Sequence, residues 1–164
     1  SAKNDELVGI EVEIYHPVLP ENDKVLMLGY LDVVLRDKRT DRVRIIDIKT
    51  STMGWNKYQK ADKIKASQLV LYKEYFAKQY GFDVEKIDIL YFIVKRKLIE
   101  GAMFPQRRVQ EFSPNAGPRK TKQILASMDK FVEDVLDETG AYIDKEYKCG
   151  SPFGKCDNCC DFVK

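Results

Sequence analysis

The feature that most constrains this chain is an acid set into an isoleucine-rich strand pattern, in the segment RIIDIKTS at residues 44–51. Side chains alternate between the two faces of a strand, so Asp47 and Lys49 share one face with Val43 and Ile45. A strand this apolar is expected to face a core, where a carboxylate needs a partner to offset the loss of water. The pattern therefore predicts a polar site where the chain would otherwise bury only aliphatic side chains.

A second acid, Asp32, lies in the preceding apolar segment VLMLGYLDVVLR at residues 25–36. The short, turn-forming connection DKRTD joins the two segments, which predicts an antiparallel hairpin that can bring Asp32 beside Asp47. Two carboxylates held close in a partly desolvated site repel each other, and a divalent cation such as Mg²⁺ or Mn²⁺ relieves that repulsion. Lys49 would then position or deprotonate the attacking water and steady the charge that develops on a phosphate. A structural ion pair between Asp47 and Lys49 at a sheet edge is the plainer alternative, because 33% of the chain is charged.

Residues 57–80 predict a long amphipathic helix that ends at Gly81. Ile64, Gln68, Tyr72 and Phe76 recur every four residues and form one stripe of that helix. Gln68 is the polar member of this stripe, and its amide needs hydrogen-bonding partners. An active site or a DNA phosphate would supply them, and so would a loop at the margin of the stripe.

The remaining segments predict one α/β (α+β) domain, which suits a chain of 164 residues. The chain is expected to begin with a three-stranded antiparallel meander and to continue with a central strand, an edge strand and a second helix. Gly140 is expected to end that helix. The expected strands are 8–15, 25–36, 42–50, 86–97 and 107–112, and the second helix is 120–140, with Val8, Ile10, Val12 and Ile14 on one face of the first strand. This order predicts a mixed central sheet of about five strands flanked by helices.

Three short motifs follow one another along these elements: GYLD at 29–32, DIK at 47–49 and QLVLY at 68–72. In order and spacing they resemble the G-x-x-D, (D/E)-x-K and Q-x-x-x-Y motifs of the PD-(D/E)XK nuclease superfamily. The resemblance is to its RecB-like branch, which includes RecB and AddB nuclease domains, CRISPR-associated adaptation nucleases and phage exonucleases. It covers residues 8–97 and, more loosely, the tail. It implies a restriction-endonuclease-like core, with a nuclease domain at 1–148 and a cysteine-bearing tail at 149–164.

The resemblance also implies residue roles and a reaction. Asp32 and Asp47, with the backbone carbonyl of Ile48, would bind Mg²⁺ or Mn²⁺. Lys49 would be the catalytic lysine, and Gln68 and Tyr72 would order the site and contact DNA. The implied reaction is hydrolysis of DNA phosphodiester bonds by an exonuclease or a helicase-associated nuclease in recombination, repair or phage DNA processing. The expected partners are single- or double-stranded DNA with free ends and a helicase or another replication or recombination protein, in cis or in trans. The expected location is the cytoplasm of a bacterial or phage-infected cell.

One departure keeps a second function open. Many RecB-like members carry a further acid or histidine on a helix before the first strand, and this sequence, which we expect to be a fragment of a longer protein, holds no such helix. Glu11 and Glu13 could substitute, whereas His16 falls in a turn and is expected to be a bystander. Without the helix, the domain could bind metal weakly and act as a DNA-binding or scaffold module of the same fold.

All four cysteines fall in the tail, as Cys149, Cys156, Cys159 and Cys160. The C-x-x-C spacing lets two thiolates reach one metal centre, so Zn²⁺ or a [4Fe–4S] cluster is a further cofactor candidate in the full-length protein. Several RecB-like nucleases resemble this arrangement but take their first cluster cysteine from upstream of the fold, where this sequence has none. Free buried thiols, or a small metal-stapled interaction domain, are the alternatives.

The formal net charge of +2 does not by itself indicate a nucleic-acid partner, but the basic residues are clustered. The clusters are Lys95–Lys97, Arg107–Arg108, and Arg119, Lys120 and Lys122. Such groups can follow a phosphate backbone, and solvated surface charge is the alternative. No apolar run approaches the roughly 20 residues of a membrane-spanning helix, so no membrane partner is expected.

Overall fold

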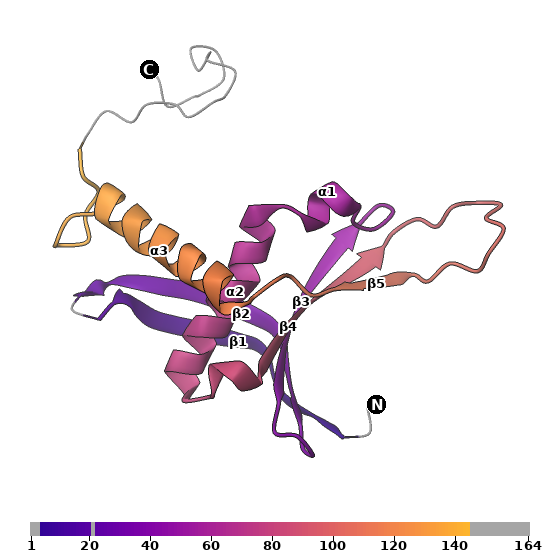
Figure 1. Cartoon of the computed structure of the whole chain (residues 1–164), viewed down its shortest axis with the longest axis horizontal. Coiled ribbons are helices and arrows are strands. Elements are labelled where there is room, and N and C mark those ends of the chain that lie inside the picture. Colours follow the sequence, from indigo (N-terminus) through magenta and orange to yellow (C-terminus); the bar gives the residue numbers. More distant parts are fainter. Residues whose placement is uncertain (1–3, 21, 145–164) are drawn as a thin grey trace, which may run out of the picture.

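The computed structural model describes residues 4–20 and 22–144, and the four tail cysteines lie outside these ranges. Five strands form one sheet in the order β1-β2-β3-β4-β5, in which β3 and β4 are parallel and the other neighbours antiparallel (Figure 1). The strands are β1 (Asp5–Leu19), β2 (Asn22–Asp37), β3 (Val43–Ser51), β4 (Ile87–Lys95) and β5 (Val109–Phe112), and the helices are α1 (Lys57–Lys60), α2 (Lys63–Tyr80), the 3₁₀ helix η1 (Val84–Lys86) and α3 (Pro118–Val135). The predicted mixed five-stranded sheet flanked by helices is confirmed.

Helix α2 makes the crossover that the parallel pair β3–β4 requires. Its apolar side chains pack with those of the sheet in one core, which contains Leu69, Phe76, Ile45 and Ile89. Helix α3 contributes Ile124 to the same core. No helix in the described part of the chain is long and apolar enough to span a bilayer.

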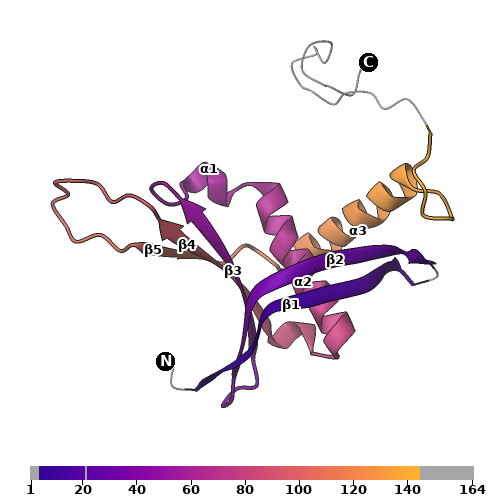
Figure 2. The same cartoon turned by 180° about the vertical axis from the view of Figure 1, so that it is seen from behind.

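The sheet divides where β2 and β3 stop pairing. Their ladder covers only four residue pairs, from Arg36–Val43 to Val33–Ile46. Beyond it, β1 and β2 continue together as a two-stranded hairpin arm (residues 12–20 and 22–31), while β3 runs on beside β4. Figures 1 and 2 show the hairpin arm leaving the sheet on one side of α2 and the ends of β3, β4 and β5 leaving on the other.

The hairpin arm is held by both long helices. The Tyr80 hydroxyl of α2 donates to the Glu13 carbonyl over 2.6 Å, and the Tyr15 N–H donates to the Gln79 side chain over 2.7 Å. Farther along the arm, Val18 and Val25 form a second small core with Val132 of α3. The arm therefore has a fixed position relative to α2.

Two predicted helix boundaries are wrong for local reasons. The helix predicted over 57–80 is broken at 61–62, because the Asp62 side chain accepts the Ile64 N–H over 2.9 Å and caps a new helix, α2. The helix predicted to end at Gly140 stops at Val135. The Asp137 carboxylate instead accepts the N–H groups of Thr139 and Ala141 in a turn, where Gly140 has φ 80°. Only the glycine predicted to end α2, Gly81, caps its helix, with φ 70°.

The first strand is longer than predicted and does not alternate as predicted. It reaches Leu19 through residues that resemble a loop in sequence. The pairing register shifts between Leu7 and Gly9, and Glu11 has φ 52°. As a result Val8 and Ile10 are 45% and 66% exposed, and only the later part of the predicted apolar face reaches the core.

Candidate active site

Asp32 and Asp47 lie where the two strands separate. The pair after Val33–Ile46 in the ladder would be Asp32 with Asp47, but the ladder ends before it. Instead, Oδ2 of Asp32 accepts the Ile48 N–H over 2.6 Å. Because the ladder has ended, no backbone carbonyl of β2 accepts the Ile48 N–H, and the Asp32 carboxylate accepts it instead. This hydrogen bond holds Asp32 beside β3.

Asp47 is the buried acid of the site, with 4% of its surface exposed. The Lys49 ammonium lies 3.2 Å from Oδ1, which accepts a hydrogen bond, and 2.8 Å from Oδ2. The contact with Oδ2 lacks hydrogen-bond geometry, so this buried oxygen accepts no hydrogen bond from any described residue. Burial raises the pKa of Asp47 above its usual range and the nearby Asp32 charge adds to this, while Lys49 opposes it.

This set of oxygen atoms fits a divalent cation. It offers a buried carboxylate oxygen without a hydrogen bond, a second carboxylate close by, and the backbone carbonyl of Ile48, the residue after Asp47. Among residues 4–20 and 22–144, no group of three or more His, Cys, Asp or Glu side chains surrounds a possible metal position. Two carboxylates with water ligands suit Mg²⁺, which keeps several waters and commonly binds through one or two carboxylates.

Tyr91 of β4 links the site to Gln68 and Tyr72 of helix α2. On β4, Tyr91 pairs in register with Asp47, is fully buried, and donates its hydroxyl to the Lys65 carbonyl over 2.5 Å. Its oxygen lies 3.5 Å from Oε1 of Gln68, and Nε2 of Gln68 donates to the Tyr72 hydroxyl over 3.2 Å. Burial, followed by the Asp47 charge, raises the pKa of Tyr91, so its hydroxyl keeps its proton and donates.

The sequence analysis did not identify Tyr91 or the residues that pack beside it. Trp55 packs its ring on Tyr91 at 4.9 Å between centroids, and Lys65 lies 5.3 Å above the Trp55 ring. The Gln110 side chain accepts the Trp55 N–H and donates to its carbonyl, over 2.7 and 3.1 Å. The available signal was a tyrosine within the apolar run DILYFIV, because a buried hydroxyl needs a partner.

The glycine of the GYLD segment makes room for Tyr72. A Cβ atom built on Gly29 would lie 2.8 Å from Cε1 of the Tyr72 ring. Ordinary contacts between carbon atoms are about 3.5–4.0 Å. The first motif therefore supplies both the acid Asp32 and the space in which the third motif packs.

The other candidate ligands lie elsewhere. The register places Glu11 opposite Asp32 across the hairpin, but its side chain is exposed. Glu13 accepts a 3.4 Å hydrogen bond from the Tyr30 hydroxyl on the hairpin arm. The His16 ring packs edge-on against Tyr75. The candidates Cys149, Cys156, Cys159 and Cys160 fall outside the described residues.

Hydrolytic sites built around a divalent cation use groups of this kind: a buried acid, a second acid fixed by a backbone N–H, and a lysine two residues after the first. The family model of the PD-(D/E)XK nuclease superfamily matches residues 2–162 of this sequence. The chain therefore belongs to the PD-(D/E)XK nuclease superfamily. No curated protein matches it.

Gly29→Ala is expected to lower the free energy of unfolding by about 1–3 kcal/mol, because the added methyl group overlaps the Tyr72 ring. Urea unfolding of the single and double variants measures the effect. Adding Tyr72→Leu should recover part of the loss, since it removes the ring, whereas adding Tyr72→Phe should recover none. Equal losses in both double variants would contradict the contact.

Asp47→Asn is expected to raise the free energy of unfolding at pH 7 by roughly 1 kcal/mol in chelator, as removal of an active-site charge commonly does. The folded-state pKa of Asp47 lies above the usual 3.8, so folding favours the protonated acid. The free energy of unfolding of the wild-type protein therefore falls as the pH rises from 3.8 through the folded-state pKa. The gain should therefore shrink as the pH is lowered towards 4 in chemical unfolding experiments. Asp134→Asn, exposed on α3, is the control and should change little. A wild-type protein more stable than Asp47→Asn at pH 7 would show instead that the pair with Lys49 stabilises the fold.

Proposed function

We propose that this chain is a Mg²⁺- or Mn²⁺-dependent deoxyribonuclease of the RecB-like branch that hydrolyses DNA from free ends. The observation that carries the proposal is the buried Asp47, which has one oxygen without a hydrogen bond, contacts the Lys49 ammonium and lies near the Asp32 charge. That oxygen lies 2.8 Å from the Lys49 ammonium without hydrogen-bond geometry, so it keeps lone pairs that a ligand could use.

Asp32, Asp47 and the Ile48 carbonyl would hold the metal ion. When bound, the ion would polarise a phosphate oxygen and lower the pKa of a water molecule. The hydrogen bond from the Ile48 N–H keeps Asp32 in place before the ion arrives. Preorganised carboxylates do not have to be gathered during binding, so this bond favours metal affinity.

Lys49 would act on the substrate. Its side chain is 36% exposed, while that of Asp47 is 6% exposed. The ammonium therefore lies at the surface of the site, where it can stabilise negative charge on a phosphate and orient the attacking water. Lys57, Lys60 and Lys63, on the short helix α1 and the start of α2, add positive charge to the segment that follows β3.

Gln68 and Tyr72 would position the reacting groups. They are linked to each other by a hydrogen bond, and Gln68 approaches Tyr91, the register neighbour of Asp47. This row of side chains, from Tyr91 on β4 to Gln68 and Tyr72 on α2, thus couples the position of the helix to that of the buried acid. The Q-x-x-x-Y spacing of this pair supports the RecB-like branch, and with it action on DNA ends and cooperation with a helicase.

Lys49→Ala is expected to reduce DNA hydrolysis at least about a hundredfold, the size of effect seen when one stabilising donor is removed from an active site. Linear and circular DNA, single- and double-stranded, would be incubated with Mn²⁺, Mg²⁺ or chelator. An exonuclease digests the linear forms and spares the circular ones.

The matched control is Lys38→Ala, because Lys38 lies in an exposed surface pair with Glu6. It should retain full activity. Binding of DNA without hydrolysis under either metal would overturn the nuclease proposal and favour a DNA-binding module. Activity in chelator, or undiminished activity in Lys49→Ala, would overturn the proposed site.

A further inference from the structure

The connection between β4 and β5 carries a concentration of positive charge. This basic loop (residues 95–108) has five cations and one acid, Glu100, a net charge of +4 in a chain whose total is +2. The cations are Lys95, Arg96, Lys97, Arg107 and Arg108. No described carboxylate forms an ion pair with any of them. Their field is therefore available to an anionic partner.

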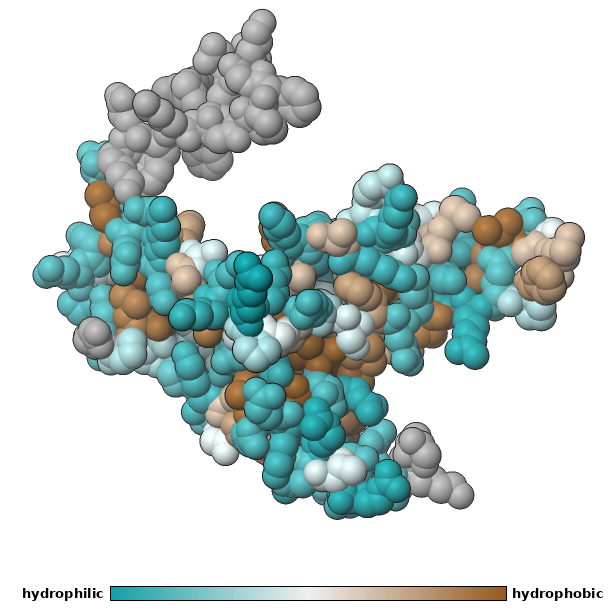
Figure 3. Space-filling view, viewed as in Figure 1, coloured by the Kyte–Doolittle hydropathy of each residue, from teal (hydrophilic) through white to brown (hydrophobic). Residues whose placement is uncertain are grey.

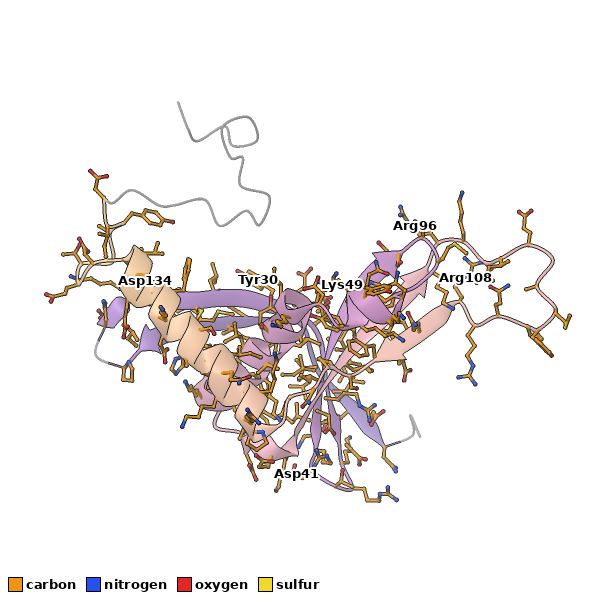
Figure 4. The ribbon with its side chains drawn as sticks, turned by 45° about the horizontal axis from the view of Figure 1, so that its top comes forward. Tyr30, Asp41, Lys49, Arg96, Arg108 and Asp134 are labelled. Atoms are coloured by element: carbon orange, nitrogen blue, oxygen red, sulfur yellow. The ribbon has the colours of Figure 1, made fainter. Side chains whose placement is uncertain are left out.

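The base of the basic loop is tied to the strand that carries the site. The Arg96 and Lys97 N–H groups donate to the carbonyls of Ser51 and Thr52, each over 2.8 Å. The Arg96 guanidinium also donates to Oγ1 of Thr52 over 3.0 Å. Ser51 follows Lys49 by two residues, so the base of the loop is held close to the segment that carries the site. In Figure 4, Lys49 lies between Tyr30 of the hairpin arm and the pair Arg96 and Arg108.

The loop narrows to a neck and ends in an apolar tip. The Gln106 side chain accepts the Ile99 N–H and donates to the Ile99 carbonyl, over 3.0 and 2.8 Å, which closes the neck. Beyond it, Met103 and Phe104 are 88% and 75% exposed, and Ile99 is 57% exposed. Apolar side chains gather at this projecting end in Figure 3. Grouped apolar side chains in a strongly basic, polar surrounding commonly mark a binding surface.

We propose that the basic loop binds unpaired DNA bases next to the active site, with its cations on the phosphates and Phe104 and Met103 stacked on the bases. This inference rests on the proposed function and narrows its substrate to DNA with a single-stranded extension or an opened end. Bases inside a duplex are stacked on both faces, whereas unpaired bases offer free faces to aromatic side chains. The anchorage of the loop beside the strand that carries Lys49 favours DNA over a membrane or a protein partner, because it places the loop cations near the proposed site of phosphodiester hydrolysis.

The first test uses binding alone, in the Lys49→Ala background and in chelator. Fluorescence anisotropy would compare a blunt duplex with the same duplex carrying a single-stranded extension of about ten nucleotides. Phe104→Ala is expected to weaken binding of the extended duplex about tenfold and of the blunt duplex less than twofold. Phe131→Ala removes a ring that is 58% exposed on α3 and should leave both affinities unchanged. Met103→Ala repeats the test if circular dichroism shows that Phe104→Ala is misfolded.

Charge and stacking are separated by a second pair of variants. Lys97→Ala and Arg107→Ala should weaken binding of both DNAs alike and reduce the salt dependence of affinity. Wild-type affinities in Phe104→Ala, or equal losses on the two DNAs, would overturn the inference, as would Phe104-dependent binding of anionic lipid vesicles. If one of these results is found while the wild-type protein still cuts DNA, only the inference about the basic loop fails. If the wild-type protein neither binds nor cuts any DNA, the proposed function fails with it.

Discussion

The separation of β2 from β3 is the constraint on which the rest of the structure depends. Two antiparallel strands that stop pairing leave unpaired N–H groups, and such a group is costly to bury. Here the Asp32 carboxylate accepts the N–H of Ile48 and closes the ladder with a charged side chain. The separation thereby fixes Asp32 and leaves Asp47 without a pairing partner on β2. It also sends the hairpin arm and β3 to different sides of α2.

The site that results holds a charge in an unfavourable place. Asp47 is buried, its pKa is raised by that burial, and one of its oxygens accepts no hydrogen bond from the described residues. Around it, the Tyr91 hydroxyl and the Gln68 amide are held by hydrogen bonds to α2. A surrounding that leaves one buried acceptor without a hydrogen bond suits a site organised for a ligand, in which stability is lower than the fold could reach.

Much of this could be predicted from the sequence, because it depends on local patterns. The alternation in RIIDIKT places Asp47 and Lys49 on the buried face of β3, and the short DKRTD turn leads to the antiparallel pairing of β2 with β3. The spacing of GYLD, DIK and QLVLY indicates the superfamily that the family comparison confirms. The alternation, the turn and each single motif span fewer residues than one strand and its turn.

The features that the sequence did not reveal depend on contacts between distant residues. Tyr91 matters because β4 lies parallel to β3 with Tyr91 beside Asp47, and no local pattern gives that register. The break before α2 depends on whether Asp62 caps a helix or continues one. Similarly, the basic clusters at 95–97 and 107–108 are visible in the sequence, but the hydrogen bonds that tie them to Ser51 and Thr52 are not.

The central claim is that Asp32 and Asp47 hold one divalent cation together. Calorimetric titration of Mn²⁺ into the wild-type chain, Asp32→Asn, Asp47→Asn and the surface control Asp134→Asn tests it most directly. Asparagine at position 32 can still accept the Ile48 N–H, so the fold is kept while the charge is lost. The account predicts one Mn²⁺ site in the wild-type and Asp134→Asn proteins and at least about tenfold weaker binding in either active-site variant. Equal affinity in all four proteins would contradict it.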